Sequence, residues 1–156
     1  MNHLLPAVMF CLLAAQPAIT AELTAFDPFL GMWAGSGTLW GKPAAIQLQW
    51  KRTPVGKFVS LDFEVSDPDS RKSLFAGHAM YPAGQGTWHD TNGAVYSITW
   101  TADGDNIVVE WGQPGVPIGK SVYSVRTGGE VEITDFVRNK DGSWREFAHY
   151  VAVVPR

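Results

Sequence analysis

The chain has 156 residues, of which 46% are hydrophobic and only 17% are charged. Its length supports one ordinary domain, and the 7 Trp in so hydrophobic a chain exclude intrinsic disorder. Lys and Arg number 12 against 15 Asp and Glu, which gives a formal net charge of −3, and the basic residues are scattered along the chain. The sequence therefore lacks the basic surface that a nucleic-acid-binding protein or a polybasic membrane anchor requires.

Residues 1–21 have the pattern of a secretory signal peptide. The segment carries no acidic or basic side chain, and its apolar run from Leu4 to Ala15 is too short to span a bilayer as a helix. Ala21 would occupy the position just before a cut ahead of Glu22. We therefore expect a signal peptide at 1–21, with a buried N-terminal helix as the alternative.

Cleavage at this point leaves residues 22–156 as the mature domain. Cys11 is the single Cys of the chain and would be removed, so the mature protein would contain no disulfide and no Cys-ligated metal. It would also contain no integral membrane segment. The expected location is the periplasm or the medium.

Short turn signals divide the rest of the chain at intervals of about ten residues. Asn92-Gly93 and Asp103-Gly104 are typical, because Asn and Asp tolerate left-handed geometry and Gly adopts it freely. The segments between the turns are rich in Val, Ile, Thr, Phe, Tyr and Trp, which suit a pleated sheet. Strands are expected near 32–40, 45–52, 57–66, 73–81, 86–90, 94–101, 106–111, 120–126, 130–138 and 143–153.

Alternation within these segments indicates a sheet with one dry and one wet face. Apolar and polar residues alternate from Ile46 to Lys51, and Asp135 shares the apolar side of the segment 131–137. Short connections predict antiparallel neighbours, and closure of the sheet removes two exposed edges. We predict an all-β, single antiparallel up-and-down barrel of about nine or ten strands, with a sandwich as the alternative. A short helical turn around residues 23–30 would form a lid or plug.

The domain opens with Gly31-Met32-Trp33. A Gly-x-Trp at the start of the first strand resembles the opening motif of lipocalin and calycin barrels. In those proteins the Trp plugs the closed end, and an Arg on the last strand packs across its ring. The resemblance implies these roles for Trp33 and Arg145, joined by a cation–π contact. As a whole, residues 22–156 resemble a family of small, uncharacterised, secreted bacterial lipocalin-like proteins.

A narrower likeness is to nitrobindin-like haem barrels. These also open with Leu-Gly-x-Trp followed by Gly-x-Gly, which is matched here by Gly35-Ser36-Gly37. Their haem iron is held by a His near the C-terminal end. The resemblance implies that His149 would be the iron ligand if this barrel binds haem. The Gly-Ser-Gly segment itself fits close packing between strands better than a nucleophile elbow between a strand and a helix.

Two histidines are candidates for contact with a ligand. His149 shares a predicted strand face with Phe147, so an inward face would project its imidazole into an apolar cavity. His78 could join the same cavity. The structural alternative is a His that is hydrogen-bonded within the barrel wall or packed at the rim. The spacing of the histidines does not form a zinc motif, so no metal site is expected.

Aromatic residues supply the remaining candidates. Trp50, Trp100 and Trp111 lie on predicted apolar faces, and Tyr96 shares the side of Trp100. Such rings are suited to lining a cavity for a flat or acyl ligand. The alternative is that they fill a small barrel completely. The Pro- and Gly-bracketed segment 112–119 is expected to form a long loop that either rims the open mouth or is an ordinary connector.

The sequence contains no Gly-x-Ser-x-Gly nucleophile motif, and we assign no catalytic residue. The favoured function is therefore a secreted barrel that binds a small hydrophobic or amphipathic molecule without a cofactor, rather than an enzyme. One alternative is a haem barrel with His149 as the ligand. A second is a filled barrel that acts as a protein-interaction module.

Overall fold

The computed structural model describes residues 23–156, and the predicted signal peptide lies outside the described residues. A short 3-10 helix, η1 (Thr24–Phe29), precedes ten strands. These are β1 (Gly31–Leu39), β2 (Lys42–Arg52), β3 (Phe58–Ser66), β4 (Ser73–Pro82), β5 (Gly86–Asp90), β6 (Val95–Asp103), β7 (Asn106–Gln113), β8 (Val116–Arg126), β9 (Glu130–Arg138) and β10 (Trp144–Val153). No helix within residues 23–156 is long and apolar enough to cross a membrane.

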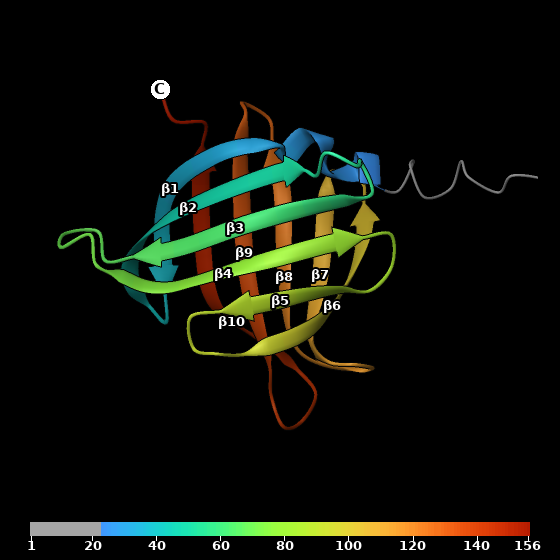
Figure 1. Cartoon of the computed structure of the whole chain (residues 1–156). Coiled ribbons are helices and arrows are strands. Elements are labelled where there is room, and N and C mark those ends of the chain that lie inside the picture. The colour runs from blue at the N-terminus through green and yellow to red at the C-terminus, as the bar shows by residue number, and fades with distance from the viewer. Residues whose placement is uncertain (1–22) are drawn as a thin grey trace, which may run out of the picture.

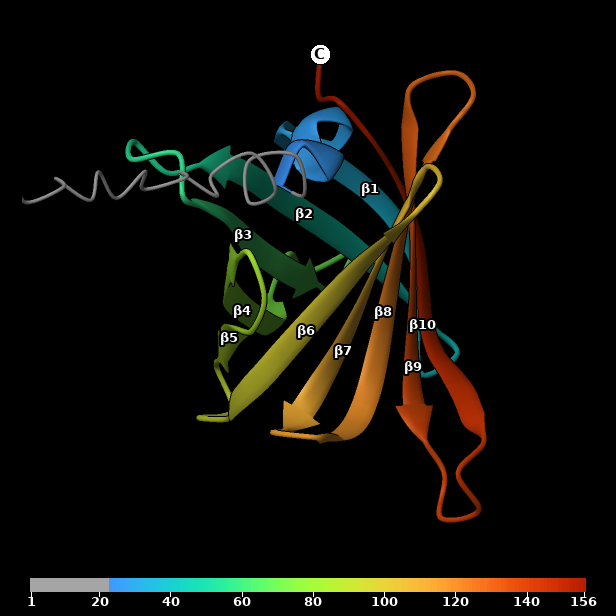
Figure 2. The same cartoon turned by 90° about the vertical axis from the view of Figure 1, so that its right-hand side faces the viewer.

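The strands form one closed barrel in which each strand pairs with its neighbours in sequence and β10 pairs with β1. All of these pairs are antiparallel, as Figures 1 and 2 show. The prediction of an all-β, up-and-down antiparallel barrel with a short N-terminal helical turn is confirmed.

Two glycines of β1 allow the last strand to close against the first. A Cβ atom on Gly35 would lie 1.9 Å from the backbone oxygen of Val151, and one on Gly37 would lie 1.9 Å from that of His149. Neither position therefore has room for a side chain. The Gly-Ser-Gly segment serves the close packing of β1 on β10, which agrees with the close strand packing predicted from sequence.

The segment 112–119 forms a hairpin instead of the expected long loop. β7 continues to Gln113 and β8 begins at Val116, so only two residues make the turn. Gly115 has a φ of 75°, and the register shifts between Trp111 and Gly112. The Pro and Gly residues of this segment thus mark a tight turn and a β-bulge, both of which use them without ending the strand pairing.

Aromatic side chains from η1 seal one end of the barrel. Phe26 is fully buried, and its ring centroid lies 5.4 Å from that of Trp50, 5.1 Å from Tyr81 and 4.7 Å from Trp100. The guanidinium of Arg52 at the end of β2 donates to the Leu23 carbonyl at 3.0 Å. This bond ties η1 to the barrel wall, and the helical turn expected from sequence is therefore a plug.

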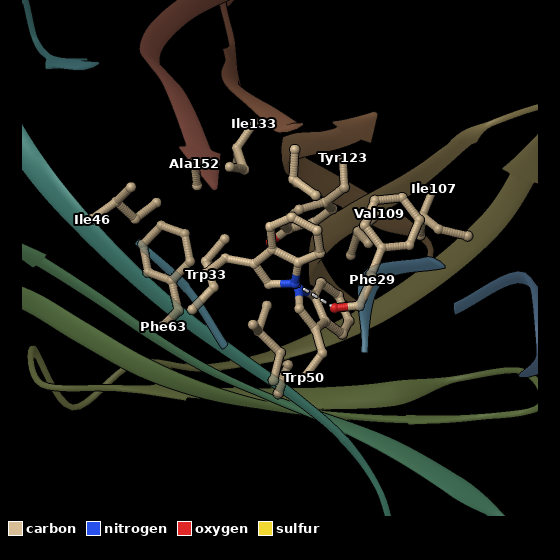
Figure 3. Close-up of a cluster of buried hydrophobic side chains, with 14 of the residues drawn as sticks. Phe29, Trp33, Ile46, Trp50, Phe63, Ile107, Val109, Tyr123, Ile133 and Ala152 are labelled. Atoms are coloured by element: carbon tan, nitrogen blue, oxygen red, sulfur yellow. Dashed lines mark hydrogen bonds between the residues drawn. The ribbon is translucent and has the colours of Figure 1, made fainter. Parts of the chain in front are cut away.

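Trp33 links β1 to this plug. Its indole Nε1 donates a hydrogen bond of 2.6 Å to the backbone carbonyl of Phe29, the last residue of η1 (Figure 3). Only 6% of the Trp33 surface is exposed. The indole thus satisfies its one polar atom while its ring fills the closed end.

The predicted contact between Trp33 and Arg145 is wrong. β1 and β10 are antiparallel with Ala34 opposite Val153, so the start of β10 lies at the far end of the barrel from the start of β1. Arg145 lies eight residues along β10 from Val153, which corresponds to about 26 Å of strand. Arg145 instead places its guanidinium 5.3 Å from the ring centroid of Trp40, in the turn after β1.

Replacing Trp33 with Phe is expected to lower the free energy of unfolding by about 1–3 kcal/mol, because the Phe29 carbonyl loses its donor and the smaller ring leaves a void. Urea unfolding followed by circular dichroism measures the change. Trp40→Phe is the matched control, since Trp40 is 55% exposed at the opposite end. An unchanged stability of the Trp33 variant would contradict its sealing role.

Candidate functional site

The end of the barrel opposite η1 contains a cavity of about 390 Å³. The closed half beneath it is filled by the plug and its aromatic neighbours, so the barrel is solid at one end and hollow at the other. All four tyrosines of the chain line this cavity. Most of the remaining wall is apolar and includes Leu39, Phe63, Val65, Phe75, Trp88, Ile98, Val109, Trp111 and Val137.

One wall of the cavity is a stack of two rings on β4 and β5. The centroids of Phe75 and Trp88 lie 6.0 Å apart with an interplanar angle of 18°. A Cβ atom on Gly77 would lie 2.0 Å from Cζ2 of Trp88, so glycine is required for the indole to rest on β4. The Trp88 Nε1 donates to Asp90 Oδ2 at 3.2 Å, which fixes the outer edge of this wall.

Another wall is built around Trp111 on β7. Its ring covers Gly119 on β8, where a Cβ would lie 1.9 Å from Cζ2 of the indole. Its Nε1 donates to Ser121 Oγ at 3.3 Å, and its ring centroid lies 5.6 Å from that of Tyr96. Tyr96 and Trp111, both expected from sequence to contact a ligand, therefore line the cavity side by side.

Trp50 and Trp100, the other two aromatic candidates, lie in the closed half and do not line the cavity. Trp50 is 1% exposed and packs edge-on against Tyr123 at 5.2 Å, beneath the cavity floor. The Trp100 Nε1 donates to the Pro82 carbonyl at 2.9 Å. Strand alternation correctly indicated that both rings face inward. The alternation does not predict how far along the barrel axis each ring lies. That position decides whether a ring packs in the plugged half or lines the cavity.

His149 lies on the outer surface, so its prediction as an inward ligand is wrong. Its Nε2 is 2.7 Å from Glu132 Oε1, and 42% of the side chain is exposed. The cause is a β-bulge at Phe147, where the register shifts between Glu146 and Ala148. The extra residue exchanges the two faces of β10, so Phe147 reaches the cavity while His149 points away from it.

His78 also faces outward. Its Nδ1 is 2.7 Å from Asp62 Oδ1 on the neighbouring strand, and the flanking residue Ala79 is buried. The haem alternative does not fit this arrangement, because it assigned the iron to His149, whose imidazole is outside the barrel. None of the described cavity-lining residues is a His, Cys or Met.

Sequence reasoning missed the main polar group of the cavity, which is Asp135 on β9. This side chain is 7% exposed and lines the cavity floor. Desolvation by burial raises the pKa of its carboxyl from 3.8 to about 6, and a hydrogen bond from Ser121 partly opposes that shift. The signal was present in the sequence, since a carboxyl on the apolar side of a strand is rarely tolerated without a partner.

Tyrosine hydroxyls surround this carboxyl. Side-chain hydrogen bonds link Tyr123 to Tyr81 and to Ser121. Burial raises the pKa of the phenols of Tyr81, Tyr123 and Tyr150, and the nearby Asp135 raises each of them further. The phenols therefore stay neutral at physiological pH and act only as hydrogen-bonding groups.

The mouth of the cavity is marked by Trp40 and Phe147. Their rings stack with centroids 4.7 Å apart, and the Trp40 backbone N–H donates to the Phe147 carbonyl at 2.6 Å. The guanidinium of Arg145 lies 5.3 Å from the centroid of the Trp40 ring. The bulge in β10 thus supplies part of the rim as well as turning His149 outward.

The protein is a closed ten-stranded antiparallel barrel with one plugged end, and two solved structures have a similar fold. Rv2717c from M. tuberculosis superposes with a TM-score of 0.63 over 86% of this chain and 97% of its own, at 16% sequence identity. The wild-type fluorescent protein UnaG superposes with a TM-score of 0.57 over 83% of this chain and 99% of its own, at 12% identity. No family model and no curated protein matches the sequence. At these identities the likeness establishes the fold alone.

Asp135→Asn is expected to stabilise the protein at pH 7.5 by up to about 3 kcal/mol, because the folded state no longer buries a charge. The folded pKa of about 6 lies above the ordinary 3.8. Wild-type stability should therefore rise relative to the variant as the pH falls from 6 to 4, and the advantage of the variant should disappear near pH 4.

Urea unfolding of both proteins between pH 4 and pH 8 measures this difference. Glu130→Gln, at an exposed position on the same strand, is the control for the general loss of one negative charge. A difference between wild type and Asp135→Asn that is independent of pH would show that the carboxyl is not desolvated.

Proposed function

We propose that the protein binds a small hydrophobic or amphipathic molecule non-covalently in the open half of its barrel. The observation that carries this proposal is the cavity itself, a space of about 390 Å³ bounded mainly by aromatic and aliphatic side chains. Ligand pockets generally occupy roughly 300–1,000 Å³. The cavity therefore suits a ligand of two or three rings, or a short acyl chain, rather than a large cofactor.

Burial of the ligand against these walls supplies the affinity. Apolar area removed from water contributes roughly 25 cal/mol per Å², before the cost of ordering the ligand is subtracted. The walls are already held in place: Trp88 rests on Gly77, and Trp111 rests on Gly119. Rings fixed in this way lose little freedom when a ligand arrives, which favours binding.

The hollow half supports the carrier function over the filled-barrel alternative, in which only the outer surface would act. We further propose that the protein works in the periplasm or the medium as one of the small secreted bacterial lipocalin-like proteins. The Gly-x-Trp opening, the calycin-like barrel and the signal-like segment 1–21 support this placement. The proposal assigns no cofactor, metal or catalytic residue.

Nile red, a neutral apolar dye, tests the cavity as the binding site. Its emission should rise on binding to the wild-type protein, and Val137→Trp should weaken that binding by at least about tenfold because the new ring occupies the cavity. Val151→Trp is the matched control, since Val151 is 40% exposed on the outside of β10.

Fluorescence titration gives the two dissociation constants, and circular dichroism verifies that both variants are folded. Equal dye binding by the Val137 and Val151 variants would show that the dye binds outside the cavity. Failure of the wild-type protein to bind the dye would count against the carrier function.

Expression of the full chain in a Gram-negative host tests the location. The protein recovered from the periplasm or the medium should begin at Glu22, as measured by intact mass spectrometry and N-terminal sequencing. Replacing Leu12 and Leu13 with Arg should keep the protein in the cytoplasm, because a charged segment no longer forms the apolar core of a signal peptide. Export of that variant at the wild-type level would contradict the assignment.

A further inference from the structure

We infer that the cavity selects a ligand that carries a hydrogen-bond donor, best a protonated amine, and that this donor binds Asp135 at the cavity floor. The inference rests on the proposed function and names the ligand class for the same site. It predicts the opposite preference from a carrier of fatty-acid carboxylates. Four features of the cavity support it.

The first feature is the charge of the lining. Asp90 near the mouth and Asp135 at the floor are both carboxylic acids, and none of the described lining residues is Lys, Arg or His. Arg145 is not among the lining residues, and its guanidinium lies 5.3 Å from the ring centroid of Trp40 at the mouth. An anionic head group at the floor would therefore meet Asp135 without a counterion, which is strongly unfavourable in an apolar site.

The second feature is the unused hydrogen-bonding capacity of Asp135. A carboxylate offers about four lone-pair sites. In residues 23–156, Ser121 is the side chain that hydrogen-bonds to it. Tyr123 is engaged with Tyr81, and the Trp111 indole N–H is directed at Ser121. The remaining acceptor sites of the carboxylate are open to a donor that enters the cavity.

The third feature is the set of neutral hydroxyl groups that neighbouring strands place around the carboxyl. Ser121 and Tyr123 come from β8, Tyr150 from β10 and Tyr81 from β4, and all are neutral. A protonated amine has three donors and a positive charge. It would pair with Asp135 and use the tyrosine oxygens as further acceptors, so that both the ligand and the carboxylate are satisfied.

The fourth feature is the energetic cost of this residue in the unliganded fold. Burial of Asp135 disfavours its ionised form, and its strand neighbours Ile133 and Val131 are fully buried apolar residues that pack without such a cost. A residue that weakens folding in a cavity wall is most simply explained by a role in binding.

Three naphthalene derivatives with matched rings test the inference: naphthylethylamine, naphthylethanol and naphthylacetate. Isothermal titration calorimetry at pH 7.5 should show that the amine binds most tightly and the carboxylate most weakly, with dissociation constants that differ by about tenfold or more. Asp135→Asn should weaken binding of the amine by about tenfold and remove the difference in affinity between the three ligands. The affinity for the alcohol should change by less than about threefold. Glu130→Gln, which removes a charge from the outside of the same strand, should keep the wild-type ranking.

A pH series on the wild-type protein provides a second measurement without a mutation. The amine should bind about tenfold more weakly at pH 5 than at pH 7.5, because protonation of Asp135 removes its partner. The Asp135→Asn protein should lack this dependence. The inference would be overturned if the wild-type protein preferred naphthylacetate. It would also be overturned if the affinity for the amine changed neither with pH nor on Asp135→Asn substitution.

The two proposals fail in different ways. Binding of Nile red together with an unchanged ranking in Asp135→Asn would overturn the amine selectivity and leave the carrier function standing. Absence of binding for Nile red and for all three naphthalene derivatives would overturn both.

Discussion

The structure depends on the aromatic plug at one end of the barrel. Phe26 and Phe29 project from η1 into the strands, and the hydrogen bond from the Trp33 indole to the Phe29 carbonyl holds the plug against β1. This packing fills the barrel to the level of Trp50. Because the plug uses the largest inward rings of that half, the hollow space is confined to the other end. The position of the cavity is thus a consequence of where the plug stops.

A conflict between stability and binding is concentrated in the open half. The cavity leaves apolar walls without packing partners, and Asp135 adds a desolvated carboxyl to them. Both features weaken the folded state relative to a filled barrel. The closed half compensates with dense aromatic packing. The molecule therefore separates its two requirements along the barrel axis, with stability at the plugged end and recognition at the open end.

The in-and-out pattern of side chains was predictable from sequence wherever the strands are regular. Tyr96 and Trp111 were expected to face inward, and both line the cavity. The bulge at Phe147 broke the pattern on β10, because one extra residue exchanges the faces of the strand. The expectation for His149 failed at that point. The alternation placed Asp135 on the apolar face of its strand. Only the tertiary structure showed that its carboxyl lies in the wall of the cavity.

The sequence by itself determined the class of fold, because turn spacing and two-residue alternation are local properties that each segment carries alone. It also indicated a short lid or plug before the first strand and close strand packing at Gly35 and Gly37, although the structure was needed to show that the packed partner is β10. Only the tertiary structure decided which inward rings fill the barrel and which surround a cavity. It likewise separated Arg145 from Trp33. The physical reason is that height along the axis depends on strand register and barrel closure, which join residues far apart in the chain.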